Sequence, residues 1–175
     1  DNLRSLQLGL TARQVGLSMD FTPDERQRYN LKAEEGDYSD GNRRHFAQAA
    51  AEWRLAQAPV AVWAGLRHTR FAFAQQLNNG YFNPMRFASS QLTLRAHWRP
   101  GGESGRWDFS AQAAVGREHA DPDGSKPAYD AAATAGWRLD RDTRLAFRLQ
   151  RFSSRTGGLS GFARTTAGLA LERAW

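Results

Sequence analysis

Residues 161–175, GFARTTAGLALERAW, alternate between two kinds of side chain and end on an aromatic residue. In an extended chain one face is mainly apolar and carries Ala163, Thr165, Ala167, Leu169, Leu171 and Trp175. The opposite face carries Phe162, Arg164, Thr166, Gly168, Ala170 and Glu172. Because successive side chains of a strand point to opposite sides, this stretch predicts a strand with one apolar and one polar face.

The same alternation recurs along the chain. The segments expected to be strands are 15–21, 28–34, 44–55, 60–67, 91–98, 106–118, 130–139, 144–152 and 161–175, and Leu6, Leu8 and Leu10 could add one more. No segment approaches the roughly 18 uninterrupted apolar residues of a membrane helix. Alternating strands with a final aromatic predict an all-β fold, an antiparallel up-and-down transmembrane β-barrel or the C-terminal part of a larger one, with about 8–10 strands in one domain, 1–175.

One stretch favours a helix by composition. Residues 47–51 are rich in alanine, the best helix former. Trp53 and Leu55 nevertheless continue the apolar face at every second position, whereas a helix would need apolar residues three and four apart. We therefore expect a strand here.

The connections between the segments differ in length on the two sides. The expected short ones are 140–142, 100–105, 57–59 and 23–25, and the expected longer ones are 155–161, 120–129 and 73–87, with 38–42 as a short exception. Trp53, Trp98 and Trp137 lie on the apolar face beside short connections. Barrels in the bacterial outer membrane typically have short periplasmic turns, longer external loops and an aromatic girdle. The sequence therefore predicts that the protein lies in the bacterial outer membrane. Outer-membrane lipid is then one partner.

The charge does not indicate nucleic acid. The net charge is +6, but Lys32 and Lys126 are the only lysines and the arginines are dispersed among acidic residues. Phosphate tracking needs a one-sided basic stripe, so no nucleic-acid partner is expected. The absence of cysteine excludes disulfides and thiol nucleophiles.

Two loop motifs carry a resemblance to a known family. Gly36-Asp37-Tyr38-Ser39-Asp40-Gly41-Asn42 is followed by Leu77-Asn78-Asn79-Gly80-Tyr81-Phe82-Asn83-Pro84, with Arg86 and Ser89 behind it. This pair resembles the C-terminal outer-membrane barrels of tetratricopeptide-repeat exopolysaccharide-export proteins, the type found in the C component of cellulose synthase and in poly-N-acetylglucosamine export porins. The resemblance implies export of an exopolysaccharide across the outer membrane. Its implied partners are the polysaccharide chain, the barrel-assembly machinery, and upstream periplasmic repeats or an inner-membrane synthase complex.

The chain departs from that family in two ways. It contains no 34-residue helical repeat, and its strand count is below the roughly sixteen of a glycan-conducting pore. We therefore expect it to be the C-terminal portion of a longer protein. Two alternatives remain open at this point: a non-transporting barrel acting as a membrane anchor or as a phage or matrix receptor, and a soluble ligand-binding β-barrel.

Three groups of residues are candidates for function. Those expected to face the lumen are Arg95, Arg138, Arg144, Arg148, Arg164, Glu118 and Asp130; they form either a salt-bridged wall or a positive track for a glycan. Loop contacts to a glycan are expected from Tyr81, Phe82 and Arg86, unless these residues only pack the loop. Leu169, Leu171 and Trp175 are the candidate C-terminal assembly signal.

No catalytic role is predicted. His45, His68, His97 and His119 lack metal-ligand spacing, and residues 157–161 contain no nucleophile elbow. Ser153, Ser154 and His97 could supply the atoms of a hydrolase, but their spacing does not favour one. We expect no enzyme activity, no metal and no cofactor.

Overall fold

The computed structural model describes residues 7–153 and 164–173, which form one antiparallel sheet. Its nine strands are β1 (Ala12–Asp24), β2 (Gln27–Tyr38), β3 (Arg43–Ala56), β4 (Val60–Phe73), β5 (Phe87–Trp98), β6 (Trp107–Ala120), β7 (Gly124–Arg138), β8 (Thr143–Phe152) and β9 (Arg164–Arg173). Each strand pairs with the next in sequence, and a short 3-10 turn, Gly102–Ser104, lies between β5 and β6. The predicted all-β, up-and-down architecture is confirmed. In the described part of the chain, no helix is long and apolar enough to cross a membrane.

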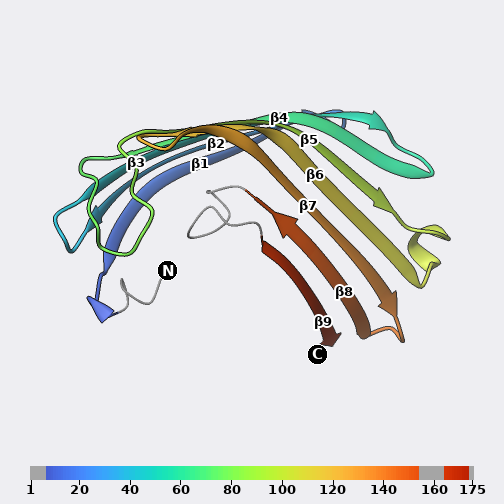
Figure 1. Ribbon diagram of the computed structural model, residues 1–175. Helices are drawn as coiled ribbons and strands as arrows, with labels where there is room; N and C mark the ends of the chain where they lie inside the picture. The colour runs from blue at the N-terminus through green and yellow to red at the C-terminus, as the bar shows by residue number, and fades with distance from the viewer. Residues whose placement is uncertain (1–6, 154–163, 174–175) are drawn as a thin grey trace.

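The sheet is strongly curved, and it is not closed. Figure 1 shows it as an arch, with β1 at one edge and β9 at the other. Between β4 and β5, residues 74–86 hang beneath the arch on its hollow side (Figure 1). Among the described residues, β1 and β9 each pair along one side only, so two rows of backbone hydrogen-bonding groups lack strand partners.

The alanine-rich segment is a strand, as predicted. Ala47, Ala49 and Ala51 lie in β3 directly opposite Ala33, Leu31 and Tyr29 of β2. Residues opposite one another in neighbouring strands share a face. The small side chains therefore leave a trough on that face between the larger side chains of β2 and β4.

One predicted connection is wrong. Residues 120–129 were expected to form a long loop, but only residues 121–123 separate β6 from β7. Gly124, with φ 75°, reverses the chain directly opposite Ala120, since glycine adopts positive φ without a steric penalty. The described residues around Leu8 and Leu10 do not form the additional strand, and the expected loop 155–161 lies entirely outside the described residues, as does Leu6.

The two faces of the sheet differ in chemistry. Large apolar side chains are exposed on one face, including Val15, Leu17, Met19, Leu31, Leu66, Leu92, Leu94, Val115, Phe147, Leu149, Leu169 and Leu171. The buried hydrophobic side chains, including Trp63, Phe73 and Phe87, lie on the opposite face with the charged residues. Phe73 packs against Tyr81 of the segment beneath the arch, so the charged face is the hollow one. We call these the outer face and the hollow face.

Candidate functional site

The hollow face carries ion pairs that reach across whole strands. Arg144 of β8 donates from Nη2 to Asp108 Oδ1 at 2.7 Å and from Nε to Asp108 Oδ2 at 3.1 Å. Gly136 of β7 lies between the two strands, opposite Asp108 of β6 and opposite Ala146 of β8, two residues from Arg144. A Cβ at Gly136 would meet the guanidinium of Arg144 and the carboxylate of Asp108. Because glycine has no side chain, the space over Gly136 is free for the ion pair between Arg144 and Asp108.

A second pair spans a longer distance. Arg67 of β4 donates from Nη2 to Asp130 Oδ2 of β7 at 2.9 Å, and also contacts Gln91 Oε1 at 2.7 Å. Of the two intervening strands, β5 presents Gln91 at this level, and β6 presents Gly116 opposite Gln91 and Ala114 opposite Asp130. As at Gly136, small side chains make room for the bridge.

A cluster of cations surrounds one tryptophan near the short-turn end of β4. The guanidinium carbons of Arg28, Arg54 and Arg95 lie 4.3, 4.6 and 5.5 Å from the Trp63 ring centroid. Arg95 also donates to Glu52 Oε2 at 2.8 Å. The ring of Trp63 is 5% exposed, so it supports the arginines and is not available for stacking by a ligand.

The other lumen candidates also lie on the hollow face. Arg148 donates to Glu172 Oε1 at 2.9 Å, and the Glu172 carboxylate is shared with Arg144. Glu118 is buried, with Lys126 Nζ 3.2 Å away. Arg138 lies opposite Arg144, and Arg164 lies opposite Phe152 at the start of β9. The structure therefore provides a largely charge-paired lining in the described strands.

The two loop motifs are joined by a hydrogen-bonded clasp. Asn42, which is 1% exposed, donates to Gln75 O at 2.8 Å and to the Tyr81 hydroxyl at 3.0 Å, and accepts from Gln75 N at 3.0 Å. Asp40 Oδ2 accepts from Asn79 at 2.9 Å and from the Tyr81 hydroxyl at 2.9 Å. These five residues, Asp40, Asn42, Gln75, Asn79 and Tyr81, are the clasp. They fix residues 74–86 to the β2–β3 turn.

Aromatic packing completes the attachment of the loop. The ring of Tyr81 stacks on Tyr38 at 5.3 Å between centroids, and Phe82 meets Phe71 and Phe87 edge-on at 6.1 and 6.0 Å. The rings of both glycan-contact candidates are therefore engaged within the protein. Arg86 is the accessible one of the three: its side chain is 85% exposed, and Asp121 lies 3.9 Å away.

The clasp shifts the ionisation of two of its members. Burial acts against the charged form of Asp40, but hydrogen bonds from Asn79, the backbone N–H of Asn42 and Tyr81 outweigh it and lower the pKa of that carboxyl. Burial raises the pKa of the Tyr81 hydroxyl, and the hydrogen bond to Asp40 adds to this effect. Both groups are thereby held in the forms that make their mutual hydrogen bond at neutral pH.

The outer face has an aromatic row beside the short turns. Trp98, Phe109, Trp107 and Trp137 form a continuous stack with centroid distances of 5.4, 5.8 and 5.5 Å. Trp53 lies on the same face, 40% exposed, and Trp175 lies outside the described residues. Rings exposed in a row at one end of successive strands match an interfacial girdle.

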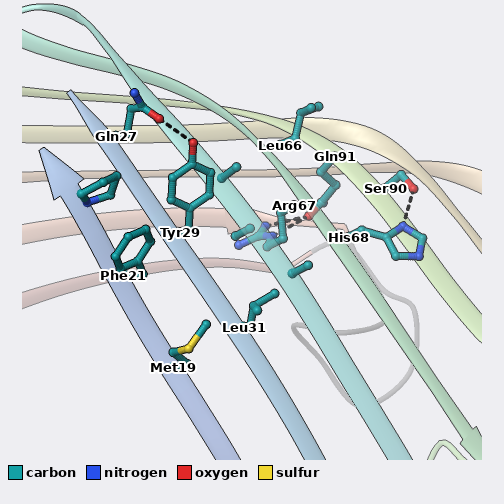
Figure 2. A pocket seen from close by; sticks show the side chains of 14 residues that line it. Met19, Phe21, Gln27, Tyr29, Leu31, Leu66, Arg67, His68, Ser90 and Gln91 are labelled. Carbon is teal, nitrogen blue, oxygen red and sulfur yellow. Dashed lines mark hydrogen bonds between the residues drawn. The ribbon is translucent and has the colours of Figure 1, made fainter.

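Above the girdle the outer face contains an open apolar groove. Figure 2 shows its lining by Met19, Phe21, Tyr29 and Leu31 on one side and Leu66 on the other, with the alanines of β3 as its floor. At its far end His68 Nδ1 lies 2.8 Å from Ser90 Oγ. The polar side chains at its margin bond to one another: Tyr29 donates to Gln27, and His68 is paired with Ser90.

The histidine and serine side chains of the described residues do not come together as a metal site or as a nucleophile with its base. The described residues contain no group of three histidine, cysteine, aspartate or glutamate side chains able to hold a metal ion. His68 and His119 make hydrogen bonds to serine hydroxyls, whereas the Ser153 hydroxyl contacts the backbone of Tyr129.

A curved antiparallel sheet with an exposed apolar outer face, an aromatic girdle and a charged hollow face defines a bacterial outer-membrane β-barrel. The chain belongs to the PgaA membrane beta barrel domain family, which matches residues 2–151. This membership excludes the soluble alternative.

A solved structure described as "Bacterial polysaccharide outer membrane secretin" has the same fold, with a TM-score of 0.79 and 17% sequence identity. The match covers 99% of this chain and 60% of that chain. This chain therefore spans about 60% of the length of that similar protein. No curated protein matches the sequence.

Proposed function

We propose that the hollow face is part of the wall of a channel that passes a polysaccharide across the outer membrane. The observation that carries the proposal is the pairing of charges along this face, in a member of a family of membrane barrels. Further strands outside this sequence would complete the wall beyond the free edges of β1 and β9. The similar polysaccharide secretin, of which this chain matches 60%, supports a larger barrel.

The chemistry of the wall favours a neutral or weakly charged glycan. Asp108, Asp130 and Glu52 are each bound by an arginine, so they do not act as free anionic sites for a cationic polymer. Guanidinium groups keep further N–H donors for sugar hydroxyls. Weak and repeated hydrogen bonds permit a polymer to slide, because no single site holds it tightly.

The segment beneath the arch would narrow this path. Residues 74–86 lie on the hollow side and are fixed there by the clasp. Arg86 is exposed where this segment enters β5, near Asp121, which also contacts His119. We propose Arg86 as a contact for the glycan where it leaves the channel at the external end. The packed rings of Tyr81 and Phe82 would shape the constriction without contacting sugar through their stacked faces.

Site-specific blocking of the hollow face tests the proposal. The 175 residues contain no cysteine, so Thr134→Cys and Ala133→Cys each introduce one thiol, on the hollow and the outer face respectively. In the full-length protein, freed of any other accessible cysteine, a bulky hydrophilic maleimide should label position 134 and reduce polysaccharide secretion at least tenfold. The Ala133→Cys variant should secrete normally after the same treatment.

A contrary result is equally clear. Complete labelling of position 134 with unchanged secretion would show that the hollow face is not the path. It would favour the anchor or receptor role instead.

A further inference from the structure

A compact group of arginine and histidine side chains lies on the outer face, at the end of the strands away from the aromatic girdle. Arg70 and His68 belong to β4, and Arg117 and His119 belong to β6. The register places His68, Ser90 and Arg117 side by side in one row, and Arg70, Ala88 and His119 in the next. All four cationic or titratable side chains are exposed. We call these four residues with Ser90 the basic patch.

The side chains of the basic patch are spaced so that they could surround one phosphate group. Neighbouring strands are about 4.8 Å apart, so Arg70 and His119 face each other across roughly 10 Å with only the methyl group of Ala88 between them. The Ser90 hydroxyl lies in the adjacent row, 2.8 Å from His68 Nδ1. A tetrahedral anion placed over Ala88 would be within reach of both arginines and of the hydroxyl group.

The two arginines of the patch have no carboxylate partner among the described residues. Arg70 and Arg117 form no ion pair with any described carboxylate. The nearby acidic residue, Asp121, already contacts His119 at 3.0 Å and Arg86 at 3.9 Å. On the hollow face, by contrast, Arg67, Arg95 and Arg144 each bind a carboxylate.

The position along the strands corresponds to a membrane surface. Ser90 precedes Trp98 of the girdle by eight residues, and Arg117 follows Phe109 of the same stack by eight. Eight residues of strand rise about 26 Å, or about 20 Å across a bilayer at a tilt near 40°. The girdle and the basic patch therefore lie at opposite boundaries of the apolar band.

An apolar groove leads directly from the patch into this band. His68 and Arg70 line one end of it, and Leu17, Leu31, Ala47 and Ala49 continue it over β1–β3, with a volume of about 410 Å³. Acyl chains fit such a surface, and a phosphate attached to them would reach His68 and Arg70 of the basic patch.

From this geometry we propose that the basic patch binds the phosphate groups of the phosphorylated glycolipid of the outer leaflet, lipopolysaccharide, with acyl chains of the lipid in the groove. The choice of lipopolysaccharide rests on the position of the patch, at the end of the strands opposite the girdle and the short turns, which faces the external leaflet. The proposal depends on the outer-membrane location and is independent of polysaccharide passage.

The test compares lipid retention by purified full-length protein. Three proteins are compared: wild type, the double variant Arg70→Gln/Arg117→Gln and the double variant Arg70→Lys/Arg117→Lys. Each is exchanged into phosphatidylcholine vesicles that contain lipid A, dephosphorylated lipid A or phosphatidylglycerol at matched charge. Arg141→Gln, in the exposed turn at the other end of the sheet, is the matched control. Heat-modifiable migration in gels identifies the folded fraction, and bound lipid is measured by mass spectrometry on that fraction alone.

A juxtamembrane arginine contributes about a five-fold factor to anionic-lipid binding. The double glutamine variant should therefore retain lipid A about 25-fold less well, with the lysine variant and Arg141→Gln close to wild type. Equal retention by the double glutamine variant and wild type would overturn the proposal. Equal retention of lipid A and phosphatidylglycerol, or of lipid A and its dephosphorylated form, would overturn it as well.

Discussion

Leu149 and Arg148 are neighbours in β8 that face opposite environments. Leu149 is on the outer face between Ala133 and Ala167, whereas Arg148 is on the hollow face and binds Glu172. Leu149→Arg should destabilise the folded barrel by about 2–4 kcal/mol if it lies near the bilayer midplane. Arg148→Gln should cost less than about 1 kcal/mol, because an exposed ion pair contributes little. Urea titration of folding into vesicles measures both, and the reverse order would contradict the assignment of the faces.

Gly136 is predicted to control the long-range ion pair above it. In Gly136→Val the added side chain should displace the Arg144 guanidinium from Asp108, because the two groups occupy the space over the glycine. Both are flexible chain ends, so the loss of folding stability should be small, about 1 kcal/mol. The displacement should appear as increased reactivity of Arg144 toward a guanidinium-modifying reagent. Gly168→Val, where an added Cβ would meet no atom within 4 Å, is the control and should leave Arg144 unchanged.

Asp40 gives the clasp a defined pH dependence. Its pKa in the folded protein is below the ordinary value of 3.8, so its contribution to stability is fully present above that value. The contribution is lost as the pH falls through the lowered folded pKa. Protease cleavage within residues 74–86 should therefore increase at acidic pH in wild type. With an acid-stable protease, the rate of this cleavage in an Asp40→Asn variant should not change with pH below pH 4. An identical rise in cleavage in both proteins would exclude Asp40 as the cause.

The β4–β5 segment shows the limits of sequence reasoning for a single element. Gly41 and Gly80 indicate turns, and both have positive φ, 81° in each case. The folding of the segment beneath the arch could not be predicted, because it depends on contacts such as Asn42 with Gln75, 33 residues apart. The available signal was Asn42 at the end of the first loop motif, but the sequence shows neither that this side chain is buried nor which segment it binds.

Asn42→Ala should release this segment. The substitution leaves the backbone N–H and C=O of Gln75 without their partners, and a buried unsatisfied polar group costs about 1–3 kcal/mol. Hydrogen exchange within residues 74–86 should accelerate at least tenfold while exchange in β6 and β7 stays the same. Gln76→Ala, at an exposed position of the same segment, should leave exchange unchanged; equal acceleration in both variants would contradict the clasp.

The strands themselves were largely predictable, since period-two alternation depends only on neighbouring residues. Alternation placed Leu145, Phe147 and Leu149 on one face, and their partners Leu171, Leu169 and Ala167 share it. The start of β7 at Gly124 was missed, because Gly124 and Pro127 are turn-forming residues that here lie within a strand.

Cross-strand partners were not predictable in the same way. Arg67 and Asp130 are 63 residues apart, and their contact requires the register of four strands and the curvature of the sheet. Sequence alternation predicted that Asp130 faces the lumen. It left the pairing of Asp130 with Arg67 undetermined.

At the scale of the whole molecule, the open sheet predicts how the isolated chain behaves. The free backbone groups of β1 and β9 would pair with other chains or aggregate. The purified 175-residue chain should therefore show no porin-sized conductance steps in planar bilayers, whereas the full-length protein should conduct. Stable, uniform conductance from the 175 residues alone would contradict this expectation.

The eight-residue spacing between girdle and basic patch has a consequence for the surrounding lipid. An apolar band of about 20 Å is shorter than the roughly 25 Å usual for outer-membrane barrels. To accommodate this hydrophobic mismatch we expect the bilayer to thin where it meets β4–β6. Thinned lipid lowers the barrier for inserting a polar-lined sheet, so the same spacing would ease entry of the folding barrel into the membrane.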